Sequence, residues 1–260
     1  MKFIILTLFP EMFTSFFEAS ILKRAIGLKK IEVKLVNIRD YTKDKYNRVD
    51  SAPIGGGAGL IMKAQPILDA IKNNSTPSTY KIALSPRGNT FNQAKSAKYA
   101  SNLNEILIFC GHYEGFDERI YKYFDEIISI GDYILTGGEP AAMAIVDSVS
   151  RLIPGVISEE SIKEESFDNG LLEYPQYTEP YNFEGEKVPD ILYSGNHTAI
   201  SKRRKKKALE LTRANRIDLF DKYPLSKNDI KLLNELDNEE TPKWEKDALE
   251  KGKKFIKNED

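Results

Sequence analysis

Residues 129–138 read SIGDYILTGG, and this glycine-closed stretch decides how the fold is interpreted. It overlaps the end of the apolar run EIISI at 126–130, which has the length of a buried strand. Glycine leaves backbone amide and carbonyl groups uncovered, so a ligand can approach them closely. The stretch therefore predicts a strand that ends in a loop with much bare backbone.

The same order of strand, loop and helix recurs through the first 155 residues. Near-continuous runs of Ile, Leu, Val and Phe predict five strands, at 2–8, 31–39, 80–85, 105–110 and 126–130. Helix-like patterns lie between or after them, at 10–25, 65–73, 92–101, 117–124 and 139–152. This alternation predicts an α/β fold with a parallel sheet that is buried on both faces.

Glycine-bearing loops follow the last three of these strands: SPRG at 85–88, GHYEG at 111–115 and the segment 131–138. Ligands of open α/β sheets bind outside the carboxyl ends of the strands, so the three loops predict one small-molecule pocket. The alternative is that these glycines only end strands. A further segment, GGGAGL at 55–60, is either a loop that approaches a ligand or a surface linker. No GxxxxGK[ST] motif is present, which argues against a P-loop nucleotide hydrolase.

The composition is typical of a globular protein, with 41% hydrophobic and 30% charged residues among 260 and a net charge of −1. Cys110 is the only cysteine, so no disulfide can form within the chain. The two histidines have no carboxylates at ligand spacing, and we expect no metal site. The first apolar run is too short for a signal peptide, and no run is long enough to span a bilayer. We therefore expect a cytoplasmic protein with no membrane partner.

The composition changes after residue 155. Residues 158–170, SEESIKEESFDNG, predict a flexible loop between two domains, an α/β domain at 1–157 and a helical domain at 171–260. Eight Lys or Arg residues and one Glu at 202–216 predict a highly charged helix. Its cations either contact nucleic acid phosphates or form a solvated face.

Six motifs occur in the order found in a known family: FPEMF (9–13), GGGAG (55–59), LSPRG (84–88), CGHYEGFDER (110–119), IGDYILTGGE (130–139) and SGNH (194–197). From residue 1 to about residue 236 the chain closely resembles the bacterial tRNA (guanine-N1)-methyltransferase family, TrmD, of the SPOUT class. The resemblance implies methyl transfer from S-adenosyl-L-methionine to N1 of guanosine 37, which follows the anticodon. It also implies a deep trefoil knot in the domain at 1–157, a tRNA-binding domain at 171–260, and a homodimer with an active site shared between subunits.

The resemblance further implies which residues bind the cofactor and the tRNA. Backbone groups of the loops would pair with the adenine edge, and apolar side chains would cover its faces. The implied cofactor-binding residues are Leu84, Ser85, Pro86, Gly111, Tyr113, Glu114, Ile130, Gly131, Asp132, Tyr133, Ile134, Leu135 and Gly138. The implied tRNA-binding residues are Gly57, Gly59, His197, Arg203 and Arg204, the last two in place of a Trp-Arg pair that is frequent in the family.

The chemistry requires a base, because guanine N1 carries a proton at neutral pH. A positioned carboxylate can remove that proton, and an arginine can stabilise the negative charge that develops on O6. Arg151 matches the family's arginine. The family's Asp-Ser-Phe motif reads Glu165-Ser166-Phe167 here, so Glu165 is the expected base and Asp168 is the alternative. The resemblance also links Mg²⁺ to methyl transfer, although the sequence shows no ligand cluster for it.

Two other functions remain open. Glu165 in place of aspartate is also compatible with a catalytically inactive RNA-binding homologue. A methyltransferase that acts on another RNA base would keep the cofactor loops and change only the target.

Overall fold

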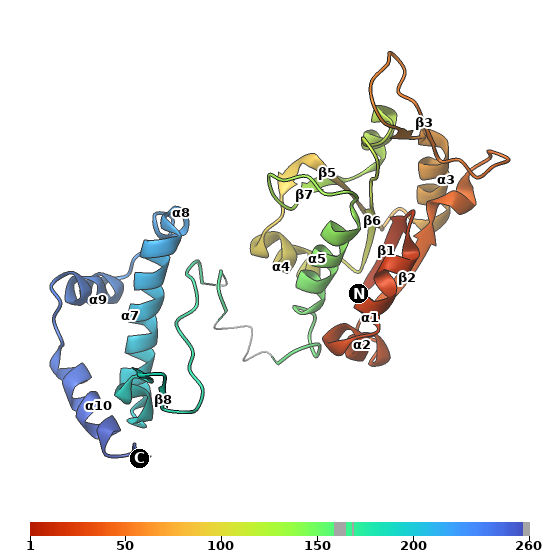
Figure 1. Cartoon of the computed structure of the whole chain (residues 1–260). Helices are drawn as coiled ribbons and strands as arrows, with labels where there is room; N and C mark the ends of the chain where they lie inside the picture. Colours follow the sequence, from red (N-terminus) through yellow and green to blue (C-terminus); the bar gives the residue numbers. More distant parts are fainter. Residues whose placement is uncertain (159–164, 168, 257–260) are drawn as a thin grey trace. The chain divides into compact units, whose positions relative to one another are not determined.

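The computed structural model describes residues 1–158, 165–167 and 169–256, and these form two compact units, Met1–Ile162 and Lys163–Asp260 (Figure 1). Within these residues no helix combines the length and the apolar character that crossing a lipid bilayer requires.

The first unit is built around a five-stranded parallel sheet in the order β2-β1-β6-β5-β7. All five predicted strands are present, and their parallel arrangement is confirmed. Their bounds are β1 (Lys2–Thr7), β2 (Glu32–Asn37), β5 (Tyr80–Thr90), β6 (Glu105–Phe109) and β7 (Glu126–Ser129). Strand β5 runs past its predicted end, because it pairs with β7 a second time after a shift of register between Leu84 and Asn89.

Helices cover both faces of this sheet (Figure 1). Their bounds are η1 (Pro10–Phe13), α1 (Thr14–Phe17), α2 (Ser20–Gly27), η2 (Ile38–Tyr41), α3 (Ala64–Asn74), α4 (Gln93–Asn102), η3 (Glu118–Tyr123) and α5 (Glu139–Ser150). The single helix predicted at 10–25 is wrong, because Ser20 adopts a left-handed conformation with φ of 49° and interrupts it. The helix predicted at 117–124 is a short 3₁₀ helix, since β7 begins only two residues after it.

The core has two layers because successive side chains of a strand point to opposite faces. In β1, Phe3 and Ile5 pack among residues of α1, α2, α4 and α5. Ile4 and Leu6 pack on the other face with residues of α3 and η3. Both faces of the sheet are thus closed, and the ends of the strands are the open places at which a ligand can reach it.

A small antiparallel sheet, β3 (Asp50–Ser51) with β4 (Ile61–Met62), was not predicted. It brackets the glycine-rich segment and ties it to the loop after β6. The Met62 amide donates to the Gly115 carbonyl at 2.9 Å, and the Glu114 amide donates to the Leu60 carbonyl at 3.1 Å. The predicted tRNA-binding residue Gly59 consequently lies against the Glu114 side chain.

The second unit is mainly helical in its described residues. It contains the hairpin β8 (Asn182–Phe183) and β9 (Glu186–Lys187), the short η4 (Asp190–Tyr193), and the helices α7 (His197–Asn215), α8 (Ile217–Phe220), α9 (Lys227–Asp237) and α10 (Lys243–Lys253). Leu209 of α7 packs with Leu232 and Leu233 of α9 in one apolar cluster. Ala248 of α10 packs with Ile191 of η4 in another.

Candidate active site

A pocket of about 490 Å³ lies at the carboxyl ends of β5, β6 and β7. These three strands are neighbours in the sheet and run in the same direction, so the loops that follow them must lie side by side. Their convergence is what the sequence predicted for the loops at 84–88, 111–115 and 130–138.

Twelve of the thirteen residues predicted to bind the cofactor line this pocket. The exception is Asp132, which lies in the same loop but is exposed and does not line the pocket. The twelve that the structure brings together are Leu84, Ser85, Pro86, Gly111, Tyr113, Glu114, Ile130, Gly131, Tyr133, Ile134, Leu135 and Gly138.

Two loops cross closely at the paired glycines Gly137 and Gly138. The Gly138 amide donates to the Gly111 carbonyl at 2.8 Å, and Gly137 forms a β-bridge with His112. A Cβ atom on Gly138 would lie only 2.8 Å from the Cα of Cys110. No residue with a side chain fits there without displacing the backbone of the pocket wall.

Behind this crossing lies a buried brace that joins β1 to the start of α5. The Thr7 hydroxyl donates to Oε1 of Glu139 at 2.8 Å, and both residues are at most 1% exposed. The Thr7 hydroxyl oxygen also accepts a hydrogen bond from the Phe9 amide at 2.9 Å. The Phe9 ring meets the ring of His112 edge-on at 4.9 Å. The brace therefore supports two of the loops that form the pocket.

The mouth of the pocket carries a charged pair that sequence reasoning did not assign. Arg87 forms two hydrogen bonds with the Glu118 carboxylate, at 2.5 and 3.1 Å, and its guanidinium lies 4.5 Å from the Tyr121 ring centroid. The hydrogen bonds from Arg87 hold the pKa of Glu118 below its usual value. Arg87 lies in the motif SPRG and Glu118 lies in the motif CGHYEGFDER. Their place in these two motifs is the sequence feature from which the pair could have been predicted.

Arg151, the predicted catalytic arginine, does not line the pocket. Helix α5 begins at the pocket and contains 12 residues, so its far end lies about 18 Å away along the axis. Arg151 caps that far end. Just beyond it, the Val156 carbonyl accepts a hydrogen bond from Arg24 at 2.6 Å, near the amino ends of the strands. A single chain therefore does not bring Arg151 to its own pocket.

Comparison with known proteins shows the family. Residues 1–222 match the family described as tRNA (Guanine-1)-methyltransferase TrmD. The chain belongs to the TrmD family. The resemblance inferred from the six motifs is thus confirmed.

Several curated TrmD-family relatives, each named tRNA (guanine-N(1)-)-methyltransferase, are more than half identical to this chain. The protein of Clostridium perfringens strain SM101 is 55% identical over 235 residues, which cover 90% of this chain and 99% of that protein. The protein of Clostridium acetobutylicum is 54% identical over 241 residues, covering 92% and 98%. The protein of Malacoplasma penetrans is 52% identical over 223 residues, covering 86% and 98%.

Gly57 lies beside Gly59 in the segment between β3 and β4 of the first unit, and the remaining predicted residues of this TrmD-family chain lie in the second unit. Of the two candidate bases, Asp168 lies outside the described residues and Glu165 lies within them. Next to Glu165, the Ser166 hydroxyl accepts a hydrogen bond from the Glu173 amide at 2.9 Å. The Phe167 amide donates to the Leu171 carbonyl at 2.8 Å. Residues 166 and 167 of the predicted interdomain loop thus lie in the second unit and are hydrogen-bonded to its residues Glu173 and Leu171.

The basic run of α7 is partly used inside the second unit. Lys206 is 7% exposed and lies between two carboxylates, 3.2 Å from Glu245 and 3.6 Å from Glu235. Arg203 donates to the same Glu245 at 2.7 Å. These acidic partners are 29 to 42 residues further along the chain, so local sequence gave no sign of them.

The remaining two tRNA-binding candidates of this unit lie on the same helix. The guanidinium of Arg204 lies 4.6 Å from the Tyr174 ring centroid. His197, the first residue of α7, is exposed. In the part of the chain that the structure describes, no three His, Cys, Asp or Glu side chains are grouped so as to hold a metal ion.

Proposed function

We propose that this TrmD-family chain is a tRNA methyltransferase that transfers a methyl group from S-adenosyl-L-methionine to N1 of guanosine 37. The observation that carries the proposal is the pocket at the carboxyl ends of β5, β6 and β7, in a chain about half identical to tRNA (guanine-N(1)-)-methyltransferases. Its volume lies in the range of sites that enclose a nucleoside-sized ligand. We place the activity in the cytoplasm, where tRNA is processed.

The lining suits the adenosyl cofactor. Bare backbone at Gly111 and Gly137 can pair with the adenine edge, and Ile134 and Leu135 can cover its faces. S-Adenosylmethionine held there would supply a methyl group on a positively charged sulfur. The close crossing of the loops at 110–112 and 137–138 supports the SPOUT-type knot. In such a knot the loop after β7 must pass tightly behind the loop after β6.

The position of Arg151 supports a homodimer with a shared site. Because Arg151 lies at the far end of α5, it can stabilise the charge on guanine O6 only at the pocket of a second copy. Exposed apolar side chains on the pocket loop support the same arrangement: Ile134 is 81% exposed and Tyr133 is 54% exposed. A second copy would cover such a rim.

In this arrangement the domain at 1–157 binds the cofactor, and the domain at 171–260 holds the anticodon arm through His197, Arg203 and Arg204. Gly57 and Gly59 would approach the substrate, since their segment is tied to the pocket loop. The loop at 158–170 supplies the carboxylate that removes the N1 proton, Glu165 or in its place Asp168. A base delivered by such a loop is kept from the site until the substrate binds.

The reaction is tested with labelled S-adenosylmethionine and two tRNA transcripts that carry G or A at position 37, with and without Mg²⁺. Label at N1 of the G transcript alone is the expected result. Binding of cofactor and tRNA without transfer would indicate an inactive homologue, and label on the A transcript would indicate another target base.

In single-turnover assays Glu165→Gln should slow transfer severely while tRNA affinity stays unchanged. If Asp168→Asn does so instead, Asp168 is the base.

The shared site is tested by mixing two inactive variants, Arg151→Ala and the pocket variant Gly138→Val. A dimer of one copy of each holds one intact pocket opposite one intact arginine. Random mixing should therefore restore about a quarter of the wild-type activity. No recovery after confirmed exchange of subunits would show that each chain completes its own site.

A further inference from the structure

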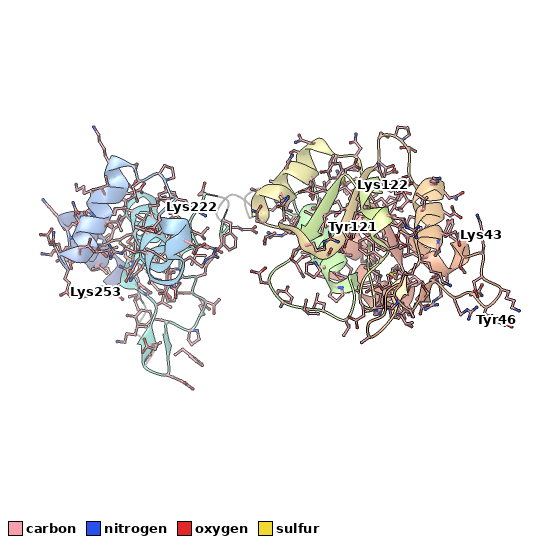
Figure 2. All side chains as sticks on the ribbon, turned by 90° about the horizontal axis from the view of Figure 1, so that it is seen from above. Lys43, Tyr46, Tyr121, Lys122, Lys222 and Lys253 are labelled. Carbon is pink, nitrogen blue, oxygen red and sulfur yellow. The ribbon has the colours of Figure 1, made fainter. Side chains whose placement is uncertain are left out.

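We propose that the loop Lys43–Arg48 of the first unit is a contact surface for the RNA substrate, with Tyr46 as a stacking platform for an unpaired base. The inference rests on the proposed function and adds a site outside the pocket and outside the basic helix. Figure 2 shows Lys43 and Tyr46 at one extremity of the first unit, well separated from Tyr121 at the pocket mouth.

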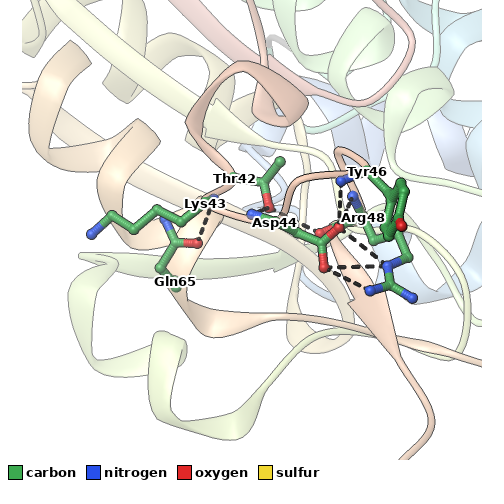
Figure 3. Close-up of polar contacts among 6 residues, drawn as sticks. All are labelled: Thr42, Lys43, Asp44, Tyr46, Arg48 and Gln65. Carbon is green, nitrogen blue, oxygen red and sulfur yellow. Dashed lines mark hydrogen bonds and ion pairs between the residues drawn. The ribbon is translucent and has the colours of Figure 1, made fainter.

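Asp44 fixes the shape of this loop (Figure 3). Its carboxylate accepts hydrogen bonds from the Tyr46 amide at 2.8 Å and from Nη2 of Arg48 at 2.9 Å. Its carbonyl accepts from the amide of Asn47, which is left-handed with φ of 56° and so closes a tight turn. The side-chain hydrogen bond from Arg48 lowers the pKa of Asp44 to about 2 and so stabilises the charged carboxylate that accepts these hydrogen bonds. The loop is therefore held in one conformation.

The loop is also joined firmly to the rest of the unit. The Lys43 amide donates to the Gln65 side chain at 3.2 Å (Figure 3). Gln65 in turn donates to the Tyr41 carbonyl at 2.7 Å. On the other side, the Lys63 amide donates to the Val49 carbonyl at 2.7 Å, at the base of the small sheet that contacts the pocket loop. An RNA bound to the loop would consequently be positioned relative to the pocket.

The exposed chemistry of the loop matches single-stranded nucleic acid. Tyr46 is 66% exposed, and the turn holds its ring away from the core. The Lys45 ammonium lies 4.7 Å from the ring centroid, and the Arg48 guanidinium carbon lies 5.3 Å from it. Lys43, whose side chain is 78% exposed, lies 3.4 Å from the Asp69 carboxylate, so the three cations of the loop are balanced by two carboxylates, Asp44 and Asp69. An aromatic ring among cations binds bases by stacking and the backbone by charge.

Charge favours RNA over a protein partner. The chain as a whole carries a net charge of only −1, so attraction for a polyanion must come from local clusters such as this one. The rigid turn also lowers the entropic cost of presenting Tyr46, because the ring is already held outward before any partner binds.

The test measures the Kd of full-length protein for the tRNA transcript over a series of salt concentrations. Tyr46→Ala should raise Kd about tenfold, while Tyr46→Phe, which keeps the ring, should bind like the wild type. Lys45→Ala should reduce the slope of log K against log salt by about one. The matched control is Lys122→Ala, which removes a cation 5.3 Å from the Tyr123 ring on the same unit and should change neither quantity (Figure 2).

Calorimetric binding of S-adenosylmethionine should be equal for all these variants, which confirms that each is folded. An unchanged Kd for Tyr46→Ala with an unchanged salt slope for Lys45→Ala would overturn the inference. A loss of dimer in Tyr46→Ala, seen by sedimentation with normal tRNA affinity per site, would overturn it in favour of a contact between copies. Wild-type protein that binds tRNA but does not methylate it would instead refute the proposed function and leave the surface standing.

Discussion

Replacing Thr7 with valine is expected to destabilise the first unit strongly, although the two side chains have nearly the same shape. The Thr7 hydroxyl is the donor to Oε1 of Glu139 and the acceptor for the Phe9 amide. Valine fills the same space and can do neither. The substitution therefore isolates the hydrogen bonds of the brace from its packing.

The magnitude follows from burial. Thr7 is fully buried and Glu139 is 1% exposed, so water cannot replace the lost donor at Glu139. The Phe9 residue is only partly buried, and its amide recovers some hydrogen bonding from water. A buried polar group left without its partner costs about 1–3 kcal/mol, and more when the group is charged. We expect the free energy of unfolding of the first unit to fall by about 2–4 kcal/mol.

The two units can be followed separately in urea, because Trp244 is the only tryptophan and lies in the second unit. Thr7→Val should move the far-UV circular dichroism transition of the first unit to lower urea and leave the Trp244 fluorescence transition in place. The control Thr7→Ser keeps the hydroxyl and should lose clearly less stability. Equal unfolding curves for the valine and serine variants would refute the reasoning, since they would show that the hydroxyl contributes nothing.

Three further substitutions test other contacts. Gly138→Ala should weaken binding of S-adenosylmethionine at least tenfold in calorimetry, because the new Cβ would press on the pocket wall, whereas Gly27→Ala, with open space around it, should bind normally. Glu245→Gln should lower the urea midpoint of Trp244 fluorescence by an amount that corresponds to about 3 kcal/mol, because it leaves the buried Lys206 with only the more distant Glu235 carboxylate. The control Glu250→Gln, on the exposed face of the same helix, should leave the midpoint unchanged. Burial, and then a hydrogen bond to the Glu126 carboxylate, raise the pKa of Tyr80 to about 12. The neutral form of Tyr80 therefore stabilises the fold below pH 10, and this stability is lost as the pH rises towards 12. Tyr80→Phe should flatten that loss in alkaline unfolding curves.

The sheet and the pocket were accessible from sequence because they depend on local patterns. Apolar runs mark buried strands, and parallel strands place the loops after them along one edge. The interruption at Ser20 was not accessible, because the pattern on both sides of it is helical and only the three-dimensional path requires the left-handed residue. The small sheet of β3 and β4 was missed for a similar reason, since each of its strands has only two residues.

The distance between the pocket and Arg151 could have been predicted but was not. Once 139–152 is taken as one helix that starts at the pocket loop, the rise of 1.5 Å per residue over these 14 residues already separates its two ends by about 21 Å. A methyl donor in that pocket therefore cannot face the arginine of the same chain. The length of this helix, which the residue pattern alone predicts, thus already separates the pocket from Arg151 of the same chain.

The basic run of α7 shows the opposite limit of sequence reasoning. Six consecutive cations suggest a phosphate-binding face, yet Arg203 and Lys206 are held by acidic side chains of α9 and α10, with which no local pattern connects them. A cation that is already paired releases fewer counterions when RNA binds, so the run must contribute less to affinity than its composition suggests. The remaining attraction has to come from cations that face solvent. In the first unit, Lys43 and Arg48 of the loop Lys43–Arg48 are likewise paired, with Asp69 and Asp44, and Lys45 faces solvent beside the Tyr46 ring. The salt slope of Lys45→Ala therefore measures how much this loop contributes to tRNA binding in addition to the basic run.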